Sequence, residues 1–244
     1  MSNIPSYGSD IDDLSWGCTH TELLFKTSAS SVKICHVKIS DVQKIALELS
    51  NSVIDTSWMM SLDIGTRRSY QKTAAETAKL LVDIFESTAS SSVVAGEFGE
   101  LMVSIGSARA LELIFDHTRI PIAELWKPQA KQNEGFDFHT TCTSNLINFG
   151  EAKYSSSATP HGNALSQASD FLEAEKHYRD RVHLINLVPQ TAIDNLDNEK
   201  FGIIAAFSIN AANPATIFYN ALRTASEILS LGKITNIYLV GVSN

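Results

Sequence analysis

The chain has few cysteines, few basic residues and no phosphate-binding glycine loop. Three cysteines in 244 residues are too few for a disulfide framework. They are expected to be reduced thiols, as in a cytoplasmic protein. Because no GxxxxGK pattern occurs, the chain is not expected to hydrolyse ATP by itself.

Long apolar segments are also missing. The strongest candidates, residues 201–209 and 237–242, have the length of strands and are too short to span a bilayer. The first five residues lack the charged and apolar pattern of a signal peptide. We therefore expect a cytoplasmic protein that neither enters a membrane nor is secreted.

Basic residues are outnumbered by acidic ones, 19 against 27, which gives a net charge of −8. Contacts to nucleic-acid phosphates depend on Lys and Arg, and an acidic field repels a duplex. If the chain acts on DNA, we expect another protein to present the DNA to it.

The order of predicted elements indicates an α/β fold, a mixed sheet flanked by helices. Strands are expected at 22–26, 31–39, 120–126, 201–209 and 236–242. Because Pro121 lies near the start of the strand at 120–126, that strand is expected at an edge of the sheet. Helices are expected after a Ser40 cap, at 69–86, through Glu97 and Glu100, at 163–183 and from Asn213-Pro214. We expect two parts, residues 1–65 as an α+β extension and residues 66–244 as the main domain.

Two further strands carry the most informative residues. Residues 135–139 read Gly-Phe-Asp-Phe-His, and residues 148–154 read Asn-Phe-Gly-Glu-Ala-Lys-Tyr. Alternate residues of a strand share a face, so Glu151 and Lys153 point the same way. A three-residue loop at 143–145, with Asn145 in the position that tolerates positive φ, pairs Cys142 with Leu146. This register places Asp137 directly opposite Glu151.

Such a cluster suits phosphate chemistry. Two neighbouring carboxylates bind Mg²⁺ or Mn²⁺, and a lysine beside them can orient water and stabilise charge developing on phosphorus. The alternative is a cross-strand ion pair on a solvated face.

The pattern of Asp137, Glu151 and Lys153 resembles the PD-(D/E)xK nuclease superfamily. Together with residues 95–102, Ala-Gly-Glu-Phe-Gly-Glu-Leu-Met, it resembles most the nuclease subunits of the bacterial Hachiman antiphage defence system (HamA-like). The resemblance covers about residues 90–171. Phe136 stands where the superfamily has proline.

This resemblance implies a restriction-endonuclease-like core and a metal-dependent deoxyribonuclease that works with a helicase subunit. It implies that Asp137 and Glu151 bind Mg²⁺ or Mn²⁺, that Lys153 is catalytic, and that Glu100 is the helix carboxylate supporting metal or water. Two alternatives stay open. The first is a catalytically silent nuclease-fold subunit that serves as a docking or regulatory module of a helicase complex, and the second is a stand-alone restriction-type endonuclease.

Other residues carry weaker signals. Glu97 competes with Glu100, or is a first-turn acid after a helix cap among residues 90–92. Gln167 and Phe171 have the spacing seen in superfamily members that act on DNA ends, although a polar edge beside a core aromatic explains them equally well. His139 is expected to fill a crowded sheet face.

A zinc site is not predicted. Cys18-x-His20 and the adjacent pair Cys35-His36 suggest one, but adjacent residues on a strand point to opposite faces. The spacing also matches no common zinc finger or ribbon.

Overall fold

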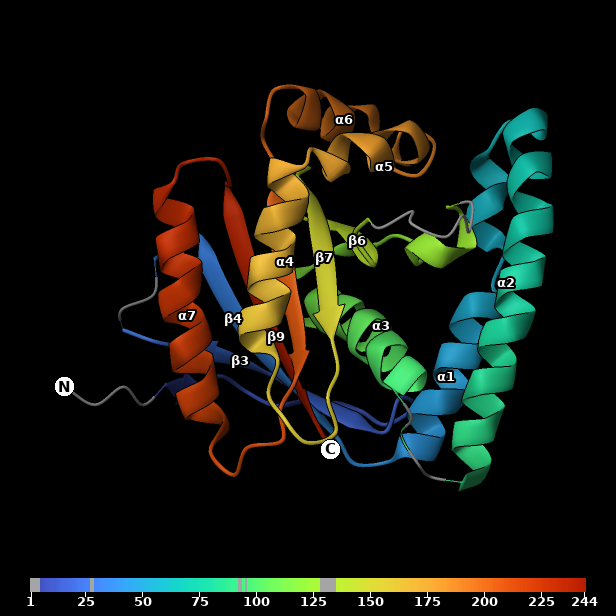
Figure 1. The fold of residues 1–244 in the computed structure, drawn as a ribbon. Helices are drawn as coiled ribbons and strands as arrows, with labels where there is room; N and C mark the ends of the chain where they lie inside the picture. Colours follow the sequence, from blue (N-terminus) through green and yellow to red (C-terminus); the bar gives the residue numbers. More distant parts are fainter. Residues whose placement is uncertain (1–4, 27–28, 92–93, 95, 128–134) are drawn as a thin grey trace.

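The computed structural model describes residues 5–26, 29–91, 94, 96–127 and 135–244. Within these residues, nine strands form one mixed sheet (Figure 1). Their order is β1-β3-β4-β9-β8-β7-β6-β5, and β2 pairs with β3. The strands are β1 (Ser6–Tyr7), β2 (Ile11–Asp13), β3 (Cys18–Leu24), β4 (Val32–Ile39), β5 (Thr118–Arg119), β6 (Phe138–Thr141), β7 (Ile147–Lys153), β8 (Gly202–Ser208) and β9 (Asn236–Ser243).

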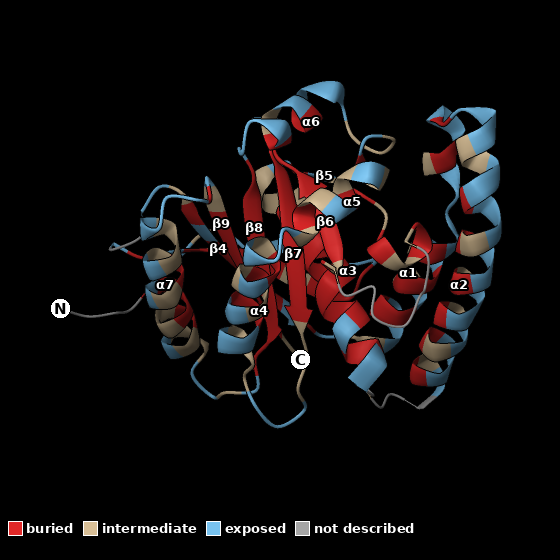
Figure 2. Cartoon of the chain, turned by 45° about the horizontal axis from the view of Figure 1, so that its top comes forward, coloured by how far each residue is buried: buried red, intermediate tan, exposed pale blue. Residues whose placement is uncertain are grey.

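The centre of the sheet is parallel and apolar. β4, β9, β8 and β7 run parallel, whereas β3 and β6 pair antiparallel to their neighbours. Every residue of β8 is buried. Strands covered on both faces are near-continuous apolar runs, as the sequences of β8 and β9 are here. Figure 2 shows that the central strands of the sheet are buried.

Helices cover both faces of the sheet. They are α1 (Val42–Ile54), α2 (Ile64–Ser91), α3 (Gly96–Phe115), α4 (His161–Glu173), α5 (Lys176–Leu184), α6 (Gln190–Asp197) and α7 (Pro214–Ser230), with 3-10 turns η1 (Ser57–Ser61) and η2 (Ala123–Leu125). α4 and α7 lie on one face, and α3 packs on the other with α1 and α2 outside it (Figure 1). The predicted α/β class, a mixed sheet flanked by helices, is confirmed.

The sheet continues across the expected division near residue 65, because β4 pairs with β9 over seven residue pairs. The two-part division itself stays a prediction. Among the helices of the described residues, none has both the length and the apolarity needed to cross a membrane.

Two predicted elements were wrong. Residues 120–126 do not form a strand, because after β5 the chain leaves the sheet and turns into η2, where Ala123 N donates to Asp137 O over 3.1 Å. The expected helix at 163–183 is two helices, because Glu175 has a φ of 54°, the left-handed conformation that breaks a helix. The helix α6 was not predicted.

The cap of α1 also differs from the prediction. Asp41 Oδ1 accepts hydrogen bonds from the backbone N–H groups of Gln43 and Lys44, both at 3.1 Å. Ser40 Oγ donates instead to Gly17 O over 2.9 Å. Asp41 is the better cap because its position one residue later lets its side chain reach the free N–H groups of the first turn.

Candidate active site

The β6–β7 hairpin has the predicted register. Phe138 pairs with Gly150 and Thr141 with Ile147, and Asn145 has a φ of 56°. Cys142 N donates to Leu146 O over 3.1 Å, which closes the loop as expected. Asp137 comes directly before β6, outside the paired residues, and its side chain reaches β7 beside Glu151, where Oδ2 accepts a hydrogen bond from Ala152 N.

Asp137 is fixed by backbone hydrogen bonds at the edge of this hairpin. Its N–H donates to Gly150 O over 2.9 Å, and its Oδ2 accepts from Ala152 N over 2.8 Å. Burial raises the pKa of Asp137, although the Ala152 hydrogen bond and the Lys153 charge oppose the rise. The carboxylate is therefore held rigidly in a site that disfavours its negative charge.

Glu151 and Lys153 form an ion pair on one face of β7, with 2.7 Å between Glu151 Oε1 and Lys153 Nζ. The Glu151 side chain is fully buried, and its Oε2 has no hydrogen-bond partner among the described residues. Burial and then the Asp137 charge raise the pKa of Glu151. Burial lowers the pKa of Lys153, but the Glu151 pair and the charges of Asp137 and Glu100 together outweigh burial and raise it.

Glu100 approaches the hairpin from α3. It is exposed, and its negative charge is among the main causes that raise the pKa values of Asp137 and Glu151. Glu97 is also exposed, but its charge is not among the main causes of the raised pKa of either Asp137 or Glu151. The electrostatics of the site therefore involve Glu100, while its role in supporting metal or water stays a prediction.

Two glycines permit close packing around the site, Gly99 between α3 and the end of β7 and Gly150 between β7 and β6. A Cβ on Gly99 would clash with the ring of Tyr154, which follows β7 directly. A Cβ on Gly150 would lie 2.5 Å from Phe138 Cε1, so the hairpin too needs a residue without a side chain there. Each glycine immediately precedes a carboxylate of the site, Glu100 or Glu151.

Sequence reasoning missed Glu124, on η2. The residue is half-buried, but its Oε2 is buried and has no hydrogen-bond partner among the described residues. Burial, followed by the charges of Asp137 and Glu100, raises the pKa of Glu124 to about 7. The signal in the sequence was a lone carboxylate in the apolar segment 120–126, which was expected to be a strand.

A second ion-pair network supports the hairpin from the side of α5. Asp180 Oδ1 lies 2.7 Å from Lys127 Nζ, and Asp180 Oδ2 lies 2.9 Å from His139 Nε2. Lys127 also donates to Phe136 O over 2.9 Å. His139 is fully buried, which agrees with its expected role of filling the sheet face.

An open pocket of about 660 Å³ extends from Lys153 along α4 and is lined by Gln167 and Phe171 among others. Phe171 is buried, with its ring centroid 3.7 Å from Lys176 Nζ. Gln167 thus faces a concave surface beside Lys153, while Phe171 is largely core.

Chemically, the carboxylates suit a hard divalent cation. Glu151 Oε2 and Glu124 Oε2 are buried oxygens without hydrogen-bond partners among the described residues, and burial, followed by the Asp137 charge, raises the pKa of both groups. No three of these carboxylates, however, have oxygens all within 4.8 Å of one another in the described part of the chain.

Comparisons of the chain with protein-family models, with curated proteins and with solved structures give no match.

Proposed function

We propose that the chain is a metal-dependent DNA nuclease that hydrolyses phosphodiester bonds at the end of the β6–β7 hairpin. The observation that carries the proposal is that Asp137 reaches β7 beside Glu151, through its hydrogen bond from Ala152 N, while the Lys153 ammonium lies 2.7 Å from Glu151 Oε1. The choice of DNA as substrate rests on the resemblance of residues 95–102, 135–139 and 150–154 to HamA-like nucleases.

Each side chain has a separate role in this proposal. Asp137 offers one carboxylate oxygen to Mg²⁺ or Mn²⁺, since its Oδ2 already accepts the Ala152 N–H. Glu151 offers Oε2, and Glu100 completes the set from α3. A bound Mg²⁺ or Mn²⁺ supplies Lewis-acid activation of the phosphate and of water. Lys153 orients water and places a positive charge beside the oxygens on which negative charge develops.

The pocket beside Lys153 provides room for the substrate. Its volume of about 660 Å³ and its open form suit a nucleic-acid strand rather than a small enclosed ligand. Its charged lining residues are Lys153, Lys176 and Asp170, so a phosphate group there would meet two ammonium groups and one carboxylate.

We also propose that a helicase partner presents the DNA and restrains cleavage, in an antiphage defence complex in the cytoplasm. The chain carries a net charge of −8 and no ATP-binding loop, so it lacks the counterion-release energy for tight binding of a duplex. A DNA-translocating partner would raise the local concentration of substrate at the site.

The experiment that tests this function incubates the purified chain, alone and with its partner, with plasmid and linear DNA. Cleavage is expected with Mg²⁺ or Mn²⁺, is abolished by EDTA, and increases when the partner engages DNA with ATP. A complex that forms stably yet never cuts DNA would favour the silent docking subunit. Failure to bind any helicase from the same genome would contradict the partner.

A further inference from the structure

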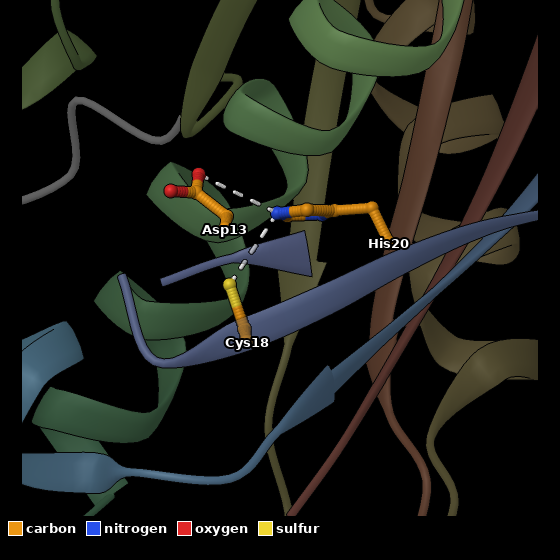
Figure 3. A group of neighbouring side chains, drawn as sticks. All are labelled: Asp13, Cys18 and His20. Carbon is orange, nitrogen blue, oxygen red and sulfur yellow. Dashed lines mark hydrogen bonds and ion pairs between the residues drawn. The ribbon is translucent and has the colours of Figure 1, made fainter. Parts of the chain in front are cut away.

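A second cluster of chemistry-bearing side chains lies far along the sheet from the β6–β7 hairpin. Asp13 ends β2, and Cys18 and His20 lie on β3 of the same hairpin, with Asp13 paired to Cys18. Cys18 Sγ lies 3.3 Å from His20 Nε2, and Asp13 Oδ2 lies 3.8 Å from the same nitrogen. Figure 3 shows the three side chains pointing toward one another.

The three side chains are buried, with exposed fractions of 7%, 4% and 0% for Asp13, Cys18 and His20. Their ligand atoms all lie within 4.8 Å of one another, and they form a group that can hold a metal ion. Sequence reasoning noticed Cys18 and His20 but paired them with Cys35 and His36. The third ligand comes instead from the preceding strand, which the spacing of Cys and His alone does not reveal.

The distances fit a tetrahedral zinc site. Bonds of about 2.3 Å from Zn²⁺ to sulfur and about 2.0 Å to nitrogen place the two ligand atoms about 3.5 Å apart at tetrahedral angles, and nitrogen and oxygen about 3.4 Å apart. The observed separation of sulfur and nitrogen, 3.3 Å, is slightly shorter than the first value, and that of nitrogen and oxygen, 3.8 Å, is slightly longer than the second. The thiolate of Cys18 and the imidazole of His20 are donors that suit Zn²⁺, whereas Mg²⁺ and Ca²⁺ prefer sites made of oxygen ligands such as the Asp13 carboxylate.

The surroundings hold the carboxylate in place. Arg109, on α3, donates from Nε to Asp13 Oδ2 over 2.8 Å, and Ser15 Oγ donates to Asp13 Oδ1 over 3.0 Å. Outer hydrogen bonds of this kind orient metal-binding carboxylates. The turn that joins the strands is fixed as well, because Gly17 has a φ of 60° and a Cβ there would lie 2.7 Å from Asp41 Cβ.

A cysteine nucleophile is a poorer explanation of the same residues. In a Cys-His-Asp arrangement the thiol and the carboxylate contact different ring nitrogens, so that the histidine can take the thiol proton while the carboxylate orients it. Here both contact Nε2 of His20. The burial of Cys18 would also keep a substrate away.

We propose that Asp13, Cys18 and His20 bind Zn²⁺ and that this site fastens the β2–β3 hairpin against α3. Binding replaces the thiol S–H bond of Cys18 by an S–Zn bond, and the proton leaves to solvent. Three protein ligands leave the fourth position for water. The proposal is independent of the nuclease function, since it concerns other residues and a different class of metal.

The test is a titration of the full-length, metal-stripped chain with Co²⁺, which reports thiolate ligands by a charge-transfer band in the near ultraviolet. The thiolate band is expected to saturate at about one Co²⁺ per chain, as for a single thiolate site, and to be displaced by Zn²⁺ but not by Mg²⁺, which at most empties the carboxylate site of the β6–β7 hairpin. Cys18→Ala should lose the thiolate band. Cys35→Ala is the matched control, since Cys35 is equally buried in the same sheet but lies outside the cluster, and should keep it.

Folding is checked separately by circular dichroism and by the melting temperature with and without Zn²⁺. Zn²⁺ should raise the melting temperature of the wild type and of Cys35→Ala. If Cys18→Ala does not fold, Asp13→Asn replaces it and should weaken Co²⁺ binding. The proposal is overturned if the wild type shows no thiolate band, if the band survives in Cys18→Ala, or if Asp13→Asn binds Co²⁺ as tightly as the wild type.

Discussion

Lys153 Nζ lies 2.7 Å from Glu151 Oε1, and this contact joins the single ammonium of the hairpin to a carboxylate that is fully buried. The other oxygen of Glu151 has no hydrogen-bond partner among the described residues. Burial of a half-satisfied carboxylate is unfavourable unless it gains a further partner. Lys153 therefore compensates part of the charge of Glu151 and leaves its second oxygen without a partner among the described residues.

Lys153→Met removes the compensating charge. Because the pKa of Glu151 is already raised by burial and by Asp137, loss of Lys153 should raise it further. A carboxyl group with a raised folded-state pKa loses its contribution to stability as the pH rises through that pKa. Lys153→Met should thus be destabilised relative to the wild type more at pH 8 than at pH 5, measured by urea unfolding.

The control for this variant is Lys72→Met, on an exposed position of α2. Surface substitutions of this kind change stability by less than about 0.5 kcal/mol, and no pH dependence is expected. Equal pH profiles for Lys153→Met and Lys72→Met would contradict the coupling of Lys153 to Glu151.

Glu124→Gln tests the carboxylate that sequence reasoning missed. The folded-state pKa of about 7 lies above the ordinary value of 4.5, so wild-type stability should fall as the pH rises between these values. One pKa unit is worth about 1.4 kcal/mol. The unfolding free energy of Glu124→Gln should therefore exceed that of the wild type by on the order of 2 kcal/mol at pH 8 and by little at pH 4. A pH-independent difference in unfolding free energy would refute the assignment.

Glu100→Gln and Glu97→Gln form a matched pair on one exposed helix face. If Glu100 supports the metal or water, Glu100→Gln should lower the cleavage rate about 10²-fold or more, whereas Glu97→Gln should leave it within a few-fold. Both variants should keep the melting temperature, because both side chains are exposed. A larger loss of cleavage in Glu97→Gln would transfer the role to that residue.

Gly99→Ala should disturb the approach of α3 to β7. The new methyl group would meet the Tyr154 ring, and such overpacking costs about 1–3 kcal/mol. In contrast, Gly106→Ala on the same helix meets only Ile45 Cδ1 at 4.0 Å, and should stabilise the protein by about 0.5–1 kcal/mol through helix propensity. Chemical denaturation measures both changes.

A second substitution separates the clash from a general effect of Gly99. In a Tyr154→Ala background, Gly99→Ala should lose its destabilising effect, because the ring is gone. If the cost of Gly99→Ala were the same in both backgrounds, the close approach at Tyr154 would not be its cause.

The register of the β6–β7 hairpin was predictable because its signals are local. A three-residue loop with Asn145 at the positive-φ position fixes which residues pair, and strand alternation then sets Glu151 and Lys153 on one face. The parallel strands β8 and β9 were predictable for a related reason, since strands covered on both faces are continuously apolar.

What the sequence did not reveal depends on contacts between distant segments. Residues 120–126 have the apolar composition of a strand, but the backbone hydrogen bond from Ala123 to Asp137 turns them into η2 and brings Glu124 to the site. The break between α4 and α5 at Glu175 could not be predicted from the residue type either, because glutamate rarely adopts the positive φ that it has here. Asp13 joins Cys18 and His20 only through the β2–β3 pairing.

The central claim is most directly tested by the initial rate of plasmid cleavage by the wild type and by Glu151→Gln, each in complex with the partner. The account predicts cleavage by the wild type in Mg²⁺ or Mn²⁺, none in EDTA, and recovery when the cation is restored. It predicts that Glu151→Gln, folded and still bound to the partner, loses at least about 10²-fold in rate. Undiminished cleavage by Glu151→Gln, or wild-type cleavage that persists in EDTA, would contradict it.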